Sequence, residues 1–353
     1  MRIRLIPIVV SGVALFAAQA SGQDAASIHE AIRRMLPTAY QGRSRGPEQT
    51  EHFSRKVKMG RDGRVSIANI AGDIVVTGVT GGSGDEVSIE ATKRTRGDKS
   101  EFGNVQITVD EHAGRVDVRT EHTGPGTSYW QWRASHVSVD YIVTVPASAS
   151  VELHSVSGSL RISGVQGAAR LETVSGSVTA SSTPRIEVAK SVSGNVEVSG
   201  SSSDGDLAAS SVSGSVHVKG VKARSIRLGA ISGDIGVSDA ACDRVDMKSV
   251  SGSVEYAGTL AKGGRYDLTS HSGAVRMILS GVLGFELDAS TFSGSINSEL
   301  PLTIGGDPGA NGANAANGRR RGISNRSMHA TFGDGSAVLT LRTFSGSIVI
   351  TKR

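Results

Sequence analysis

The sequence predicts an all-β fold, a parallel β-helix or solenoid with about 19–21 residues per coil. A short motif centred on Ser-Gly recurs along the chain, as in SVSGSVHVKG at residues 211–220. From Gly158 to Gly294 the successive glycines are 18, 18, 20, 19, 19, 21 and 21 residues apart. An aliphatic residue stands two positions after each of these glycines, which is typical of β-strands with one buried face.

Positions in the repeat are counted from its glycine, which is position 0. The glycines, to which we assign a structural role, are Gly158, Gly176, Gly194, Gly214, Gly233, Gly252, Gly273, Gly294 and Gly346, with an earlier copy at Gly72. Position +2 holds Ile74, Leu160, Val178, Val196, Val216, Ile235, Val254, Val275, Ile296 and Ile348. Position −2 holds Ile70, Val156, Val174, Val192, Val212, Ile231, Val250, His271, Phe292 and Phe344. Alternation from −2 to +2 predicts one strand with both positions facing inward.

A second strand precedes the first in each repeat. Its apolar residues lie at −7 and −5, as Val151 and Leu153 do before Gly158. Their parity is odd, so the chain must bend, and we expect a corner three or four residues before each glycine. An inward glycine indicates that the opposite wall leaves no room for a side chain. The serines beside it are expected to stack into outward ladders.

Stacked coils would close the core, because one repeat cannot bury its apolar face alone. At about 4.8 Å per coil, nine or ten coils would form a column of about 45 Å.

The beginning of the chain predicts export. Arg2 and Arg4 precede the apolar run Ile6–Phe16, and Ala18-Gln19-Ala20 forms a small-x-small cleavage site. Residues 1–20 are therefore interpreted as a secretory signal peptide, because the run is too short to span a membrane. Residues 21–50 are predicted to contain a short helix, opened by a capping box at Ser27 and Glu30, followed by a linker.

The remaining chain divides in two by regularity. Residues 51–150 contain alternating apolar runs without a fixed period, and they predict irregular β-rich first coils; a separate small β-sandwich is the alternative. Residues 151–353 predict regular solenoid repeats. Residues 305–327 are rich in Gly, Asn, Ala and Arg and predict a loop insertion between the last two copies.

Composition excludes several classes of function. The formal net charge is only +5, and the densest basic run, Arg319-Arg320-Arg321, has no interleaved aromatic residues, so nucleic-acid binding is not expected. Cys242 is the only cysteine, which excludes an internal disulfide and favours a buried small residue over a reactive thiol. No second long apolar run follows the signal peptide, so no membrane span is expected after its cleavage.

No convincing catalytic, cofactor-binding or metal-binding residues emerge from the sequence. The nine histidines lack metal-ligand spacing, and His271 is notable only because its repeat position is otherwise apolar. Asp73 and Asp234 follow the glycine in different copies, whereas carbohydrate-cleaving β-helices need converging carboxylates. The one speculative partner-binding segment contains both tryptophans of the chain, as Tyr129, Trp130 and Trp132.

The recurring motif, together with the closing AVLTLRTFSGSIVI at residues 337–350, resembles the bacterial DUF4097-type β-strand-repeat proteins, a family associated with adhesins. The resemblance extends from about Val65 to Ile350. It implies a right-handed parallel β-helix in the cell envelope or outside the cell, and it implies no established activity.

Taken together, these features predict an exported, non-enzymatic β-solenoid that acts as an adhesin-like binding or scaffolding module in the periplasm or at the cell surface. Its partner is unknown, with an envelope polysaccharide or another envelope protein as the candidates. Two alternatives stay open: a carbohydrate-active β-helix enzyme, and a self-assembling solenoid filament.

Overall fold

A computed structural model describes residues 47–60, 62–80, 85–122, 137–202, 205–281, 283–304 and 326–353. Contacts divide the chain into the units Met1–Gly46 and Pro47–Arg353, and only the second contains described residues. The predicted signal peptide and short helix therefore lie outside the described residues. No helix in the described part of the chain is long and apolar enough to cross a membrane.

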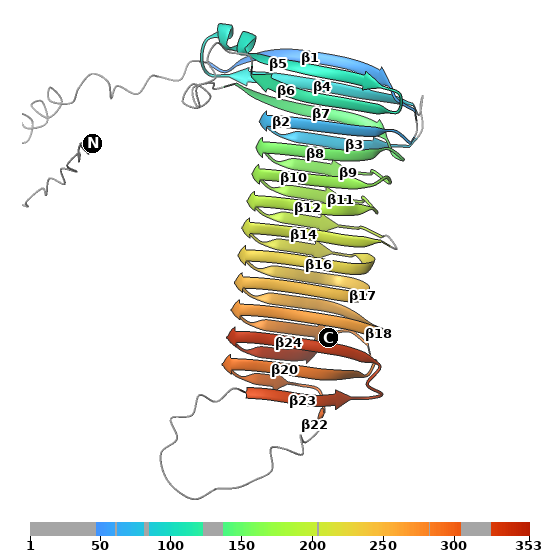
Figure 1. The fold of residues 1–353 in the computed structure, drawn as a ribbon, viewed down its shortest axis with the longest axis vertical. Helices are drawn as coiled ribbons and strands as arrows, with labels where there is room; N and C mark the ends of the chain where they lie inside the picture. Colours follow the sequence, from blue (N-terminus) through green and yellow to red (C-terminus); the bar gives the residue numbers. More distant parts are fainter. Residues whose placement is uncertain are drawn as a thin grey trace, which may run out of the picture. The chain divides into compact units, whose positions relative to one another are not determined.

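The described residues of this unit are mostly in strands, with one short 3-10 helix (Figure 1). The N-terminal elements are β1 (Gln49–Lys58), β2 (Arg64–Ala71), β3 (Ile74–Val79), β4 (Glu86–Thr95), η2 (Lys99–Asn104), β5 (Val105–His112), β6 (Arg115–His122) and β7 (Ser138–Pro146). The middle elements are β8 (Ser150–Ser157), β9 (Leu160–Ser163), β10 (Ala169–Ser175), β11 (Val178–Ser181), β12 (Ile186–Ser193), β13 (Val196–Ser199), β14 (Asp206–Ser213), β15 (Val216–Lys219), β16 (Lys222–Ser232), β17 (Ile235–Ser251), β18 (Val254–Ser272) and β19 (Val275–Leu279). The C-terminal elements are β20 (Phe285–Ser293), β21 (Ile296–Ser298), β22 (Thr303–Ile304), β23 (Arg326–Phe332), β24 (Ala337–Ser345) and β25 (Ile348–Lys352).

Each repeat forms a coil whose two strands flank the glycine. The strands pair in parallel with the same two strands of the next coil, so β8 pairs with β10 and β9 pairs with β11. The register keeps equal repeat positions side by side: Leu160 pairs with Val178, and Val178 pairs with Val196. The prediction of a parallel solenoid is therefore confirmed, with the repeat period setting the coil length.

The coils do not stack in sequence order at the two ends. At the N-terminal end, β2 and β3 lie between β8/β9 and the later strands β6 and β7. At the C-terminal end, β24 and β25 lie between β18/β19 and the earlier strands β20 and β21, as Figure 1 shows for β24 and β20. The last copy of the motif in the sequence is thus the last but one in space.

Antiparallel strands cover both ends of the stack. β5 pairs with β6, and β4 pairs with β7 and then with β1. At the other end β23 pairs antiparallel with β20, and β22 pairs with β23. These pairings occupy the outer edges of the parallel coils, which would otherwise offer open hydrogen-bonding groups to another chain.

The core is a column of aliphatic side chains from both strands of each coil. Nine of the ten +2 residues are at most 1% exposed; the exception, Ile296, is half-buried in β21 in the outermost coil of the C-terminal end. Positions −7 and −5 are buried as predicted, as with Val151 and Leu153. Close packing of β-branched side chains between two walls explains why the core needs so few aromatic residues.

The predicted inward orientation of position −2 is wrong. Val156, Val174, Val192, Val212, Ile231, Val250, Phe292 and Phe344 are 39–53% exposed, and His271 is also exposed. The first strand of each coil alternates regularly up to position −3, which faces inward, so −2 faces out. Position −1 is exposed as well, and this breaks the alternation.

The corner of the coil also differs from its predicted place. The first strand runs without interruption to position −1, so the turn lies at the glycine and the residue after it. A Cβ atom at Gly176 would collide with the carbonyl of Gly158 in the neighbouring coil. The same collision recurs from Gly194 to Gly346. The glycines are therefore required by the close approach of neighbouring corners, and not by the opposite wall.

Candidate binding surface

A buried hydroxyl at position −3 holds the corner to its neighbour in seven coils; the exceptions are the Gly158 coil, where Ser155 Oγ has no partner among the described residues, and the Gly233 coil, where Ala230 occupies position −3. The side-chain oxygen of Ser211 donates a hydrogen bond of 2.8 Å to the carbonyl of Gly194 in the preceding coil. Equivalent bonds of 2.8–3.1 Å join Thr173 to Gly158, Ser191 to Gly176, Ser249 to Gly233, Ser270 to Gly252, Thr343 to Gly273 and Thr291 to Gly346. Because this hydroxyl must point inward to reach its acceptor, the next residue along the strand must point outward.

The outward residues form one continuous apolar row, here named the outward ladder. It consists, in spatial order, of Val156, Val174, Val192, Val212, Ile231, Val250, His271, Phe344 and Phe292. Eight of the eleven large apolar side chains exposed in the described part of the chain belong to it. Exposed apolar residues are therefore concentrated on one edge of the solenoid, and they are not scattered over its surface.

Three aromatic rings stack at the C-terminal end of the outward ladder. The ring centroids of His271 and Phe344 lie 4.9 Å apart with an 8° interplanar angle. Those of Phe344 and Phe292 lie 4.6 Å apart at 4°. The inner ring faces are covered by their neighbours, and the ring edges face the solvent.

Polar residues border the outward ladder on both sides. Position −1 is serine in all nine coils, and each of these serines is exposed: Ser157, Ser175, Ser193, Ser213, Ser232, Ser251, Ser272, Ser345 and Ser293. Position −4, on the other side, is mixed: His154, Glu172, Lys190, Ser210, Gly229, Lys248, Thr269, Arg342 and Ser290. An apolar centre with a polar rim is the usual composition of a protein contact surface.

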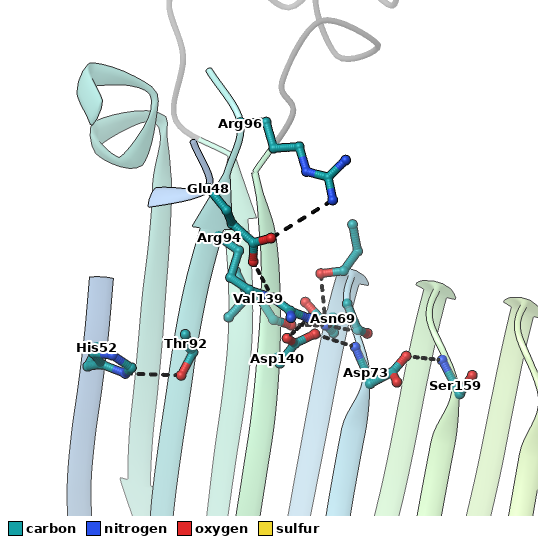
Figure 2. Close-up of polar contacts among 12 residues, drawn as sticks. Glu48, His52, Asn69, Asp73, Thr92, Arg94, Arg96, Val139, Asp140 and Ser159 are labelled. Carbon is teal, nitrogen blue, oxygen red and sulfur yellow. Dashed lines mark hydrogen bonds and ion pairs between the residues drawn. The ribbon is translucent and has the colours of Figure 1, made fainter. Parts of the chain in front are cut away.

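The carboxylates that follow the glycine have a structural partner. Asp73 Oδ1 accepts a hydrogen bond of 2.8 Å from the backbone N–H of Ser159 in the next coil, and Asp234 Oδ1 accepts one of 2.7 Å from Ser253. Figure 2 shows this bonding at the N-terminal end, where Asp140 Oδ1 in turn accepts from the N–H of Asp73 at 2.9 Å. These acidic side chains tie one coil to the next.

The same two carboxylates lie far apart. Gly72 and Gly233 belong to coils separated by four others, so Asp73 and Asp234 are about 24 Å apart at about 4.8 Å per coil. Glycosidase carboxyl pairs act across about 5–10 Å. Asp73 and Asp234 therefore do not form such a pair. The described residues contain no group of three His, Cys, Asp or Glu side chains that could hold a metal ion.

A degenerate coil, which the sequence analysis missed, lies at the N-terminal end. Tyr141 pairs with Ile74 at position +2, which places Asp140 at +1 and Val139 at the glycine position. Asn69, at position −3 of the next coil, donates 2.8 Å from Nδ2 to the Val139 carbonyl, as the hydroxyls do elsewhere (Figure 2). This coil has no Ser-Gly pair. It is identified by the parallel register of β6 with β2 and of β7 with β3.

The speculative partner-binding residues Tyr129, Trp130 and Trp132 lie outside the described residues. Their segment, residues 123–136, connects β6 to β7.

His271 and Cys242 differ in their accessibility. His271 faces outward in the ladder, so its predicted inward position is wrong. Cys242 is 3% exposed, and burial raises the pKa of its thiol to about 11, which keeps it protonated near neutral pH. Tyr266 lies close by and donates a 2.7 Å hydrogen bond to the Cys242 carbonyl. This thiol is a packing group of the core.

Comparison with known families agrees with the repeat. Residues 185–351 match the family model described as Toastrack DUF4097. This part of the chain belongs to that family. The Toastrack region contains the outward ladder from Val192 to Phe292, including the three stacked rings. No curated protein matches the sequence.

Three solved structures with low sequence identity are similar over long stretches of the chain. A "putative cell adhesion protein" from Clostridium sporogenes is 8% identical, covers 86% of this chain and 100% of its own, and has a TM-score of 0.21. A "putative adhesin" from Bacteroides fragilis is 12% identical, covers 86% and 97%, and has a TM-score of 0.39. One from Parabacteroides merdae is 11% identical, covers 65% and 89%, and has a TM-score of 0.24. With scores this low, the superpositions support no statement about the partner of the Toastrack region.

Proposed function

We propose that this chain is an exported, non-enzymatic binding or scaffolding module of the bacterial cell envelope, and that the outward ladder with its polar rims is its contact surface. One observation carries the proposal: apolar residues occupy position −2 in coil after coil although the fold leaves them in water. Serine, which occupies position −1 next to them throughout, shows that polar residues fit this edge.

The size of the outward ladder supports a contact role. The exposed fractions of its members correspond to about 700 Å² of accessible surface, whereas the largest apolar patch of a typical monomer is about 300–600 Å² and is often functional. Seven of the nine ladder residues are also held rigidly, because each of these seven follows a hydroxyl that is bonded to the neighbouring coil. A rigid contact surface loses little conformational entropy on binding.

The chemistry of the remaining polar groups supports a non-enzymatic role. Asp73 and Asp234 are bonded to backbone N–H groups in separate coils, and Cys242 is buried and protonated. Both ends of the solenoid carry antiparallel strands, which favours contact through the side of the solenoid over end-to-end filament growth. Export is supported by Arg2, Arg4 and the apolar run Ile6–Phe16.

The test compares binding of the purified chain to isolated envelope fractions. The variant V174S/V192S makes two neighbouring positions in the valine end of the outward ladder polar and is expected to lose binding. Ile142, an outward residue of β7 that is 59% exposed and lies outside the ladder, provides the matched control I142S, which should bind as the wild type does. Equal binding by all three proteins would contradict the proposal.

The aromatic segment and export are tested separately. The variant W130A/W132A shows whether the segment at residues 123–136 adds to binding. Amino-terminal sequencing of the chain recovered from the periplasm or the medium should begin at Ser21, and recovery of the uncleaved chain from the cytoplasm would contradict export.

A further inference from the structure

The outward ladder has a geometry that another copy of this chain can match. We propose that it docks on the ladder of a second copy, the two solenoids running antiparallel about a two-fold axis at Ile231. This inference rests on the proposed contact role of the ladder and names its partner. Ile231 is the middle of the nine positions, with four members on either side.

The first argument is the spacing of the side chains. Successive ladder residues are separated by one coil, or about 4.8 Å, because their strands are hydrogen-bonded neighbours. A second row with the same spacing can place its side chains against every side chain of the first, as paired sheets do in steric zippers. A second copy of this solenoid presents that spacing over all nine coils, whereas an α-helix presents one residue face every about 5.4 Å.

The second argument is the distribution of side-chain size. The three rings occupy one end of the outward ladder, and Val156, Val174 and Val192 occupy the other. In the antiparallel arrangement each ring faces a valine, so the distance between the two solenoids stays even. A parallel arrangement would set rings against rings and valines against valines, and it would leave a gap at the valine end.

The third argument is the charge of the rim at position −4. A two-fold axis perpendicular to the ladder brings this rim opposite the same rim of the second copy in reverse order. Glu172 then lies level with Arg342, Lys190 with Thr269, and Lys248 with Ser210. The two-fold axis repeats the pair of Glu172 and Arg342, so opposite charges meet twice and like charges do not meet, which favours this pairing over others.

The area is sufficient for a specific interface. The ladder contributes about 700 Å² per copy and the serine rim adds to it, whereas standard interfaces bury about 800 Å² per partner. The exposed serines at −1 are small, so the second copy can approach the apolar row closely.

Single cysteines introduced into the full chain test the pairing by mild oxidation. Ile231→Cys should form a disulfide-linked dimer by itself, because this residue meets its own copy on the axis. Val156→Cys should not link to itself but should link to Phe292→Cys when the two proteins are mixed. Glu197→Cys, exposed on β13 away from the ladder, is the matched control and should stay unlinked. The buried Cys242 does not compete for oxidation.

A charge exchange gives a second readout. Ile231→Lys and Ile231→Glu should each sediment as monomers, since like charges meet on the axis, and an equal mixture should sediment as a dimer. Position 231 is 53% exposed in the single chain, so neither substitution disturbs the core and both variants should fold as the wild type does.

The outcomes separate this inference from the proposed function. A wild-type monomer at all concentrations, or self-linking of Val156→Cys as a parallel pair requires, would overturn the antiparallel dimer. If the dimer is absent but V174S/V192S still loses envelope binding, the ladder contacts another molecule and the proposed function survives alone. If the cysteines link as expected and envelope binding is unchanged in V174S/V192S, the dimer holds and the envelope contact lies elsewhere.

Discussion

Positions +2 and −2 of the repeat carry nearly the same residues in opposite surroundings. Val216 is fully buried, while Val212, four residues earlier, is 39% exposed. Both belong to strands, both are β-branched, and both recur in every coil. The comparison shows that a regular row of aliphatic residues identifies a repeated position, and that its direction depends on the backbone between the rows.

What separates the two rows is the corner. The hydroxyl at −3 binds inward to the neighbouring glycine carbonyl, and the corner residues −1 and 0 then shift the alternation before +2. Inward rows on both strands and one outward row thus arise from one repeat. The inward rows stabilise the stack, and the outward row is available for contacts.

The largest expected effect is the contrast between Val216→Asp and Val212→Asp. A carboxylate at position 216 would be buried without a partner, which costs several kcal/mol, on the order of the whole stability of a small domain. The same change at position 212 leaves the charge in water in the single chain and should alter the stability of the monomer by less than about 0.5 kcal/mol. Urea unfolding of the two purified variants measures the difference. Equal destabilisation would show that both rows face the core.

The sequence predicted the solenoid well because two of its signals are local. The glycine spacing gives the coil length, and the aliphatic residues at +2, −5 and −7 give the core. The inward prediction for position −2 fails because alternation assumes that a row of aliphatic residues faces the core, and in this chain one aliphatic row faces the solvent. Only the hydrogen bond of residues such as Ser211 reveals the direction of the strand.

The order of the coils could not be predicted from the motif. All copies have compatible registers, so either the coil of Gly294 or the coil of Gly346 could pair with the coil of Gly273; in the structure the coil of Gly346 does so and lies between the other two. The choice depends on long-range pairing of β23 and β24 with β20, which no local pattern encodes. The degenerate coil at Val139 was missed for a related reason, since it has the register of a coil without its glycine.

A second prediction concerns the glycine that separates the two rows. Gly194→Ala would press a methyl group against the Gly176 carbonyl of the preceding coil and should cost about 1–3 kcal/mol. Gly229→Ala is the matched control, because the nearest atom to its new Cβ is Ser210 Cβ at 3.8 Å. Thermal unfolding should show a lowered melting temperature for the first variant alone. A similar fall in both would mean that backbone freedom, and not close approach, selects these glycines.

A third prediction tests the hydroxyl that sets the strand direction. Ser211→Ala removes the donor to the Gly194 carbonyl and should cost about 0.5–1.5 kcal/mol. The coil of Gly233 lacks this hydroxyl because Ala230 occupies position −3. Ala230→Ser should therefore stabilise the chain by bonding to the Gly214 carbonyl. Chemical unfolding of both variants measures the two changes in stability. Destabilisation by Ala230→Ser would contradict a general role for the hydroxyl.

The smallest expected effect belongs to the outward row itself. Phe344→Ser removes the middle ring of the stack with His271 and Phe292, and exposed cross-strand pairs contribute only about 0.2–1 kcal/mol each. The melting temperature should hence fall slightly, much less than for Leu341→Ser, which alters a buried residue of the same strand. If Phe344→Ser proved as damaging as Leu341→Ser, the rings would be part of the core and the outward ladder would be a stabilising device. A small loss of stability, together with a clear loss of envelope binding, would instead show that the apolar character of this edge serves recognition.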